Sequence, residues 1–241
     1  MKKYIPFLKG VLLLVFVVFL YGFSSSRNNA KRIKDHIDIK FEKGDNLFIT
    51  YETVNKLLVQ NFGRLQSQPK EELFLNKLEE TLLSNEMVEN AEVFIDVDGQ
   101  LGAFIKQKRP IARVNDGLVA YYMDSNGNKM PLSSNYSARV PIVEGLENGQ
   151  ISMELFKLAT VIDSDDFLKK QVVGIVQNSK KEFVLKTRIG NQEVELGTLN
   201  KLDKKIKKLK VFYQKVINDK TLSNYKTINL EYSNQVVCTK N

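Results

Sequence analysis

Residues 93–105, VFIDVDGQLGAFI, decide the fold of the first half of the chain. Apolar residues alternate with other residues on both sides of a turn, which is typical of two half-buried strands. A two-residue turn at Asp98-Gly99 would split the apolar residues across two faces of the hairpin. A three-residue connection from Asp98 to Gln100 places them all on one face, so we predict this longer, bulged connection. The expected pairs are Val97 with Leu101, Ile95 with Ala103, and Val93 with Ile105.

The residues that precede this hairpin predict a strand and two helices. Residues 37–41 alternate apolar and polar side chains, and this pattern predicts a short strand. Thr50 can cap a helix over residues 51–61, and Ser67 with Pro69 indicates the start of a second helix. The order strand, helix, helix, strand, strand predicts two helices on one face of a three-stranded sheet. The second helix presents three leucines on one side, at Leu75, Leu78 and Leu82.

This first domain, residues 37–109, precedes a sheet-dominated second domain that covers residues 110–241. Short apolar or alternating runs bounded by turn residues predict its strands. Two segments have helical spacing, residues 153–162 and the lysine-rich residues 200–218. The fold class is therefore α+β, and we expect the second domain to be mainly antiparallel with two helices. The expected strands are residues 111–114, 118–123, 129–132, 140–143, 172–176, 183–188, 194–196, 228–232 and 235–239.

The N-terminal segment predicts a membrane anchor. Residues 5–23 are nearly all apolar and long enough for a helix that crosses a bilayer. We expect residues 1–26 to form a cytoplasmic tail and a retained transmembrane helix, followed by a linker of residues 27–36. A cleaved signal peptide is the alternative, because Ser24 to Ser26 offer small residues to a peptidase. Basic residues flank both ends and leave the orientation open, whereas a long following domain favours its export.

The distribution of charge points to a membrane and not to a nucleic acid. The net charge is +8, and most of it comes from residues 1–36, beside the apolar segment. A protein that binds nucleic acid would carry the excess on its folded domains, where it neutralises phosphates. The single cysteine, Cys238, excludes an intramolecular disulfide and a cysteine-based metal site.

No set of side chains predicts catalysis, a metal or a cofactor. The only histidine, His36, lies in the linker, and the acidic residues 163–166 are interpreted as helix-capping, solvated side chains. Residues 124–128 begin like a calcium loop but lack its later ligands, so we expect an ordinary turn. The helix over residues 200–218 has an apolar stripe that suits packing on its own sheet; a surface for anionic lipid or nucleic acid is the alternative. We expect no enzyme activity and no small-molecule substrate.

The C-terminal residues predict a surface for a partner. Residues 228–239 alternate and lie at the end of the chain. A terminal strand often ends a sheet, and its unpaired backbone groups can accept a strand from another protein. The alternative is that residues 235–239 are covered or paired within the protein itself.

Four motifs occur in order along this arrangement of domains. They are RPIAR at residues 109–113, YYMD at residues 121–124 with Gly127, VPIVEG at residues 140–145, and INLEYSNQVV at residues 228–237. Together they resemble the FtsQ/DivIB family of bacterial cell-division proteins. In that family Asp and Arg usually stand where this chain has Asn229 and Glu231, and the cytoplasmic tail of the family's members is longer.

The resemblance implies a POTRA-type first domain and a scaffold of the division machinery. It implies a single-pass protein of the cell inner membrane at the division septum, with its N-terminus cytoplasmic and its large domains periplasmic. FtsB- and FtsL-like partners would add a strand to the last strand of the β domain. The scaffold would coordinate septal peptidoglycan synthesis. Other divisome components and septal wall synthases are possible further partners. The resemblance implies no cofactor. The contact residues carried over by position are Tyr232, Ser233, Asn234, Gln235, Val236 and Val237.

Two other functions compete with this interpretation. A membrane-tethered POTRA-type module for envelope assembly or outer-membrane transport is the first; tandem POTRA repeats or a following barrel would favour it. A cell-wall hydrolase is the second, and it would need a converging acid/base or nucleophilic set.

Overall fold

The computed structural model describes residues 5–30, 37–44, 46–62, 75–97, 99–117 and 119–240, and the chain divides after Gln107 into two compact units. Each unit has its own hydrophobic core. Several residues used in the sequence-based expectations lie outside the described part. They are His36 in the linker, Ser67 and Pro69 at the expected start of the second helix, and Asp98 in the hairpin turn.

The first helix, α1 (Ile5–Ala30), has 26 residues. It extends past the apolar run into the polar residues that begin at Ser24, and Lys9 lies near its other end. Within the described residues, no helix combines the length and the apolar character that crossing a membrane requires. The transmembrane helix expected over residues 5–23 is therefore not confirmed.

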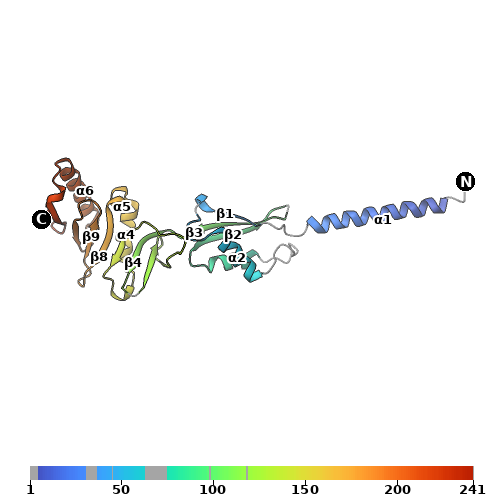
Figure 1. The fold of residues 1–241 in the computed structure, drawn as a ribbon, viewed down its shortest axis with the longest axis horizontal. Coiled ribbons are helices and arrows are strands. Elements are labelled where there is room, and N and C mark those ends of the chain that lie inside the picture. Colours follow the sequence, from blue (N-terminus) through green and yellow to red (C-terminus); the bar gives the residue numbers. More distant parts are fainter. Residues whose placement is uncertain are drawn as a thin grey trace. The chain divides into compact units, whose positions relative to one another are not determined.

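The first unit contains a three-stranded sheet in the order β1-β3-β2, with β1 parallel and β2 antiparallel to the central strand β3. Two helices pack on it (Figure 1), as the sequence predicts. Its elements are β1 (Asp38–Phe41), the 3-10 helix η1 (Glu42–Gly44), α2 (Tyr51–Phe62), α3 (Leu75–Leu83), β2 (Val88–Ile95) and β3 (Leu101–Gln107).

Side chains from both helices and all three strands form the first core. Thr50 caps α2 as expected, because its Oγ1 accepts a hydrogen bond from the backbone N–H of Thr53 at 3.2 Å. Leu78 and Leu82 of α3 are fully buried, whereas Leu75 packs at the edge of the core. The arrangement of elements in this unit is therefore the predicted one.

The observed register of the β2–β3 hairpin differs from the predicted register by two residues. Ile95 pairs with Leu101 and Val93 pairs with Ala103, so the connection has five residues instead of three. The Asp96 carboxylate accepts a hydrogen bond from the N–H of Gln100, and this bond closes the turn early. Val97 leaves the ladder and is 97% exposed. The apolar face is unchanged, because a shift of two residues keeps side chains on their own side of a strand.

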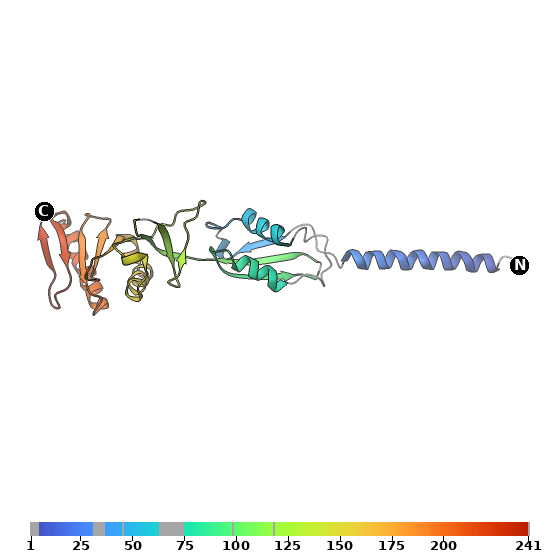
Figure 2. The same ribbon diagram turned by 90° about the horizontal axis from the view of Figure 1, so that it is seen from below.

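The second unit contains a nine-stranded sheet in the order β12-β11-β10-β9-β8-β7-β4-β5-β6. Figure 2 shows its strands side by side, from β5 in green to β12 in red. Its strands are β4 (Pro110–Asn115), β5 (Ala120–Asp124), β6 (Lys129–Met130), β7 (Ile142–Glu144), β8 (Val172–Gln177), β9 (Phe183–Thr187), β10 (Glu193–Gly197), β11 (Tyr225–Asn229) and β12 (Val237–Lys240). Its helices are η4 (Glu147–Gly149), α4 (Met153–Ser164), α5 (Asp166–Gln171), α6 (Leu202–Asn218) and η5 (Leu222–Asn224).

This sheet is mainly antiparallel, as expected, but it is mixed, because it also contains parallel pairs that were not predicted from the sequence. Most neighbouring strands are antiparallel, but β10–β11, β4–β7 and β7–β8 are parallel pairs. A parallel pair needs a long crossover connection. The connections of β7–β8 and of β10–β11 contain helices. The short helix α5 is an addition to the two expected helices. Asp165 caps it by accepting hydrogen bonds from the N–H groups of Phe167 and Leu168, each at 3.1 Å.

Candidate functional site

Strand β12 lies at one end of the nine-stranded sheet. It pairs with β11 on one side, and no strand of the described chain pairs with its other side. At the opposite end, β6 has only two residues and Pro131 follows it. Proline cannot donate to a ladder, and a very short edge strand offers few backbone groups. Of these two edges, β12 with its four residues is the better suited to accept a further strand.

The hairpin of β11 and β12 is built on the core of the second unit. Ile228 is fully buried, and its cross-strand neighbour Cys238 packs against the same core. On the opposite face, the hydroxyl groups of Thr227 and Thr239 form a hydrogen bond. One face of the hairpin is therefore anchored, while Val237 at the start of β12 is 39% exposed.

The structure places most of the expected contact residues outside the strand. Residues 232–236 belong to the connection between β11 and β12, and of the carried-over residues only Val237 lies in β12. The strands expected over residues 228–232 and 235–239 lie instead over residues 225–229 and 237–240. The open backbone edge runs along Val237, Cys238, Thr239 and Lys240, of which the last three were not among the expected contacts.

Lys208 of α6 holds the connection between the two strands. Its Nζ donates hydrogen bonds to the carbonyl oxygens of Leu230 at 3.2 Å, Gln235 at 3.4 Å, and Tyr232. One ammonium group thus contacts both ends of the connection. Lys208 was not singled out from the sequence, because a lysine that binds backbone carbonyls has no local sequence signal.

Lys205, one turn earlier on α6, fixes the end of β10. Its Nζ donates hydrogen bonds to the carbonyl oxygens of Leu196 at 2.6 Å and Thr198 at 2.7 Å, and its side chain is buried. Burial and the nearby Lys208 lower the pKa of Lys205, although the carboxylate of Glu231 acts in the opposite direction. The two lysines together connect α6 to the strand edge and to the hairpin.

The two positions that depart from the family pattern contact each other. The Asn229 side chain donates hydrogen bonds to Glu195 at 2.5 Å and to Glu231 at 3.3 Å. Asn229 Oδ1 also accepts a hydrogen bond from the N–H of Glu231 at 2.9 Å. This local turn ends β11 after Asn229, and the connection begins there.

Cys238 is the one thiol of the chain, and it lies in the edge strand. Its side chain is half-buried against the core. Burial raises the pKa of the Cys238 thiol, so the thiolate is disfavoured at neutral pH. The thiol therefore acts here as a small packed side chain.

Among the acidic residues 163–166, Asp165 caps a helix as interpreted from the sequence, whereas Asp163 is held in ion pairs and is not freely solvated. Asp163 forms ion pairs with Arg109 at 2.6 Å and with Lys169 at 2.9 Å. Partial burial raises the pKa of Asp163, but hydrogen bonds and charge from Lys169 and Arg109 outweigh it and hold the pKa below its ordinary value. Asp165 caps α5 and pairs with Lys210.

Asp124 also forms the expected ordinary turn. Its Oδ1 accepts hydrogen bonds from the N–H groups of Asn126 at 2.9 Å and Asn128 at 2.8 Å. Within the described ranges, no three histidine, cysteine or acidic side chains gather where they could hold a metal ion. The exposed β12 edge and its hairpin thus form the candidate site.

The comparisons with known families agree with the two units. A POTRA-like domain model matches residues 33–106, and a model described as FtsQ/DivIB, C-terminal related, matches residues 109–239. A search of curated proteins found no match. The fold defines a POTRA-like domain followed by a β domain, a class of division-associated scaffold proteins. The second model covers more than half of the chain, which belongs to the FtsQ/DivIB family.

Proposed function

We propose that the protein is a scaffold of the bacterial division machinery, whose β domain binds an FtsB–FtsL-type pair by strand addition to β12. The proposal includes no catalysis by the chain itself. The protein would act at the division septum and link its partners to septal peptidoglycan synthesis. Family membership supports the association with division.

The observation that carries the proposal is the position of β12 in its sheet. The strand is paired on one side only within the described chain, and its other edge offers unpaired backbone donors and acceptors. A partner strand would gain main-chain hydrogen bonds there, and contacts with side chains beside the edge would supply specificity. The connection of residues 232–236 lies directly before β12, so partner side chains can contact it while their backbone pairs with the strand.

A proline scan of β12 tests this mode of binding. Successive residues of an antiparallel strand direct their N–H groups alternately toward the neighbouring strand and away from it. Cys238→Pro and Thr239→Pro therefore remove N–H groups on opposite sides of β12. We expect one substitution to destabilise the β domain and the other to leave its stability nearly unchanged but abolish binding of the FtsB–FtsL-type pair. Binding to the full chain is measured by isothermal titration calorimetry.

The controls separate strand addition from other contacts. Lys129→Pro in the short edge strand β6, where the side chain is exposed, is expected to leave partner binding intact. Unchanged binding by both β12 variants would exclude strand addition at this edge. A fluorescent fusion that spreads evenly over dividing cells, instead of collecting at septa, would contradict the division function itself and favour the envelope-assembly alternative.

A further inference from the structure

The positive charge of the second unit is concentrated around the candidate site. Residues 200–241, which include α6 and the hairpin of β11 and β12, contain ten lysines and three acidic residues. Residues 110–199, which contain the strands from β4 to β10, have ten basic and eleven acidic residues. The proposed binding edge therefore lies in the part of the unit that attracts negative charge.

Three of the six lysines in α6 stabilise the fold. Two of them donate hydrogen bonds to backbone carbonyls, as described above, and Lys210 forms an ion pair with Asp165. The other three are exposed and form no ion pair within the described part of the chain: Lys204, Lys207 and Lys215. The ammonium groups of these three lysines are available to a partner.

The three exposed lysines lie on one side of α6, and we call them the lysine row. They occupy positions i, i+3 and i+11, which an α-helix turns to the same side, and they extend over about 16 Å. Val211, at i+7, lies between them and is 60% exposed. The acidic residues nearest in sequence, Asp203 and Asp219, lie at the two ends of the helix. The side of the helix between these ends is thus positively charged.

The lysine row lies beside the hairpin of β11 and β12. Lys208 follows Lys204 by one turn and contacts carbonyl oxygens in the connection that leads into β12. One turn further, the ring of Phe212 packs on the ring of Tyr225, the first residue of β11, with the centroids 5.5 Å apart. These residues follow one another at intervals of four along α6, so this side of the helix borders the hairpin. The row is therefore continuous with the proposed binding edge.

The surroundings of the row favour an acidic polypeptide as its occupant. A helix that lies on a membrane inserts an apolar face, but the apolar stripe of α6 is already buried in the core. A nucleic-acid-binding domain has a broad basic surface, whereas residues 110–199 have no excess of basic residues. A partner held at β12 already has its neighbouring residues close to the row, so ion pairs form there without a separate binding event.

We infer that the partner that adds a strand to β12 carries an acidic segment next to that strand, and that this segment lies along the lysine row. The inference rests on the proposed function, because the row is reached from a strand bound at β12. The added strand gains main-chain hydrogen bonds, while the row selects acidic partners and speeds their association.

The test measures the rate and the affinity of FtsB–FtsL-type pair binding to the full chain at several salt concentrations, by surface plasmon resonance. The row variant is Lys204→Gln/Lys207→Gln/Lys215→Gln. We expect it to bind about tenfold more weakly, because it loses three exposed ion pairs. Association should also be slower and depend less on salt. Glutamine is a good helix former, so the thermal unfolding temperature should stay the same or rise.

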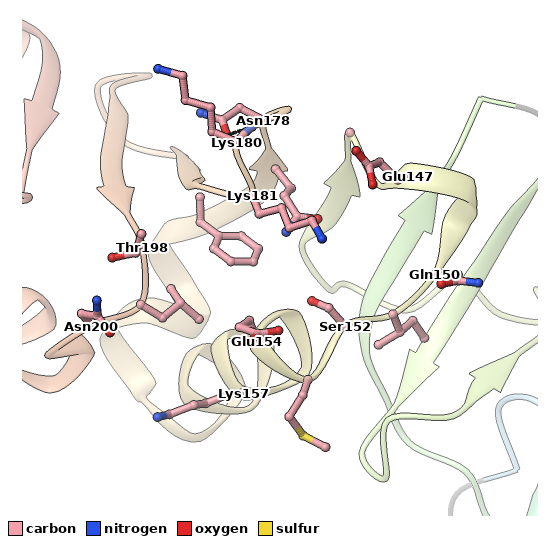
Figure 3. A pocket seen from close by; sticks show the side chains of 16 residues that line it. Glu147, Gln150, Ser152, Glu154, Lys157, Asn178, Lys180, Lys181, Thr198 and Asn200 are labelled. Carbon is pink, nitrogen blue, oxygen red and sulfur yellow. Dashed lines mark hydrogen bonds between the residues drawn. The ribbon is translucent and has the colours of Figure 1, made fainter.

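The matched control removes the same net charge from elsewhere in the second unit: Lys157→Gln/Lys170→Gln/Lys180→Gln. These lysines are exposed, form no ion pair within the described residues, and lie outside α6 and the hairpin. Figure 3 shows two of them, Lys157 and Lys180, at a cavity beside α4. The control variant should bind the pair as the unmodified chain does. Equal losses in the two variants would overturn the inference, because net charge alone would then explain the effect.

A second probe, fluorescein-labelled polyglutamate, separates the row from strand addition. We expect the unmodified chain to bind it, and the row variant to bind at least about tenfold more weakly by fluorescence anisotropy. Equal polyglutamate binding by both chains would overturn the inference even if the pair binds. If polyglutamate binds through the row but the pair does not bind at all, the proposed strand addition is wrong and the row receives another acidic partner. Tighter, row-dependent binding to phosphatidylglycerol vesicles than to polyglutamate would overturn the inference in favour of a lipid surface.

Discussion

The ammonium group of Lys208 lies 3.2 Å from the carbonyl oxygen of Leu230, and the same group also contacts the carbonyls of Tyr232 and Gln235. This lysine ties helix α6 to the residues that join the last two strands. The position of the candidate edge strand therefore depends on a helix that lies earlier in the sequence.

Replacing Lys208 should loosen this connection without unfolding the domain. We expect Lys208→Met to cost about 1–2 kcal/mol, because several carbonyl groups lose a charged donor. Hydrogen exchange should become faster over residues 230–236, and binding of the proposed FtsB–FtsL-type pair should weaken. Lys207→Met is the control, since Lys207 is exposed on the same helix. Equal exchange rates in the two variants would contradict the assigned role of Lys208.

Gly145 should tolerate no side chain. Its φ is +81°, and a Cβ atom there would lie 2.1 Å from the carbonyl oxygen of Gln177. Gly117 has a φ of +89° with nothing near its Cβ position, so it reports the backbone cost alone. We expect Gly117→Ala to cost about 1–2 kcal/mol and Gly145→Ala about 2–5 kcal/mol, measured by urea unfolding. Similar costs would show that the backbone at Gly145 moves away easily.

The ion pairs of Asp163 should make stability depend on pH in the acid range. Its pKa is lower in the folded chain than in the unfolded chain, so its contribution is present at neutral pH. The contribution disappears as pH falls below about 4 and through the folded pKa. Asp163→Asn should therefore destabilise the β domain at pH 7 and have little effect at pH 2. A constant difference in unfolding free energy between these pH values would contradict this assignment.

Cys238 offers a chemical probe of the edge strand. Because burial raises the pKa of its thiol, alkylation by iodoacetamide at pH 7.5 should be at least about tenfold slower than in the urea-unfolded chain. An added partner strand should slow the reaction further. The chain has a single cysteine, so mass spectrometry reports this site alone. An unchanged rate on saturation with the FtsB–FtsL-type pair would argue against partner contact at β12.

The arrangement of the first domain was predictable because local signals agreed with one another. The cap at Thr50, the leucines of α3 and the alternation on both sides of the turn all specify the same packing. The register was wrong by two residues because the Asp96 side chain closes the turn, and alternation alone cannot distinguish registers that keep the same face.

The edge hairpin was predictable in outline, but the bounds of its two strands were not. The alternation over residues 228–239 correctly predicts a terminal strand at the edge of a sheet. It cannot indicate that Asn229 and Lys208 hold the following residues out of the ladder, because the second contact joins residues far apart in sequence. The parallel pairing of β10 with β11 was missed for the same reason, although the intervening helix α6 is the crossover that such a pair needs.

The four-residue outer strand also makes the protein prone to self-association whenever the proposed partner is not bound. Two copies of the chain can join through the same backbone groups, and Lys240 at the end of the strand opposes this by charge repulsion. Self-association should therefore rise with protein concentration and with salt, and its extent should fall when the partner is made in equal amount. Balanced synthesis of the two proteins would then protect the cell from aggregates of the uncomplexed one.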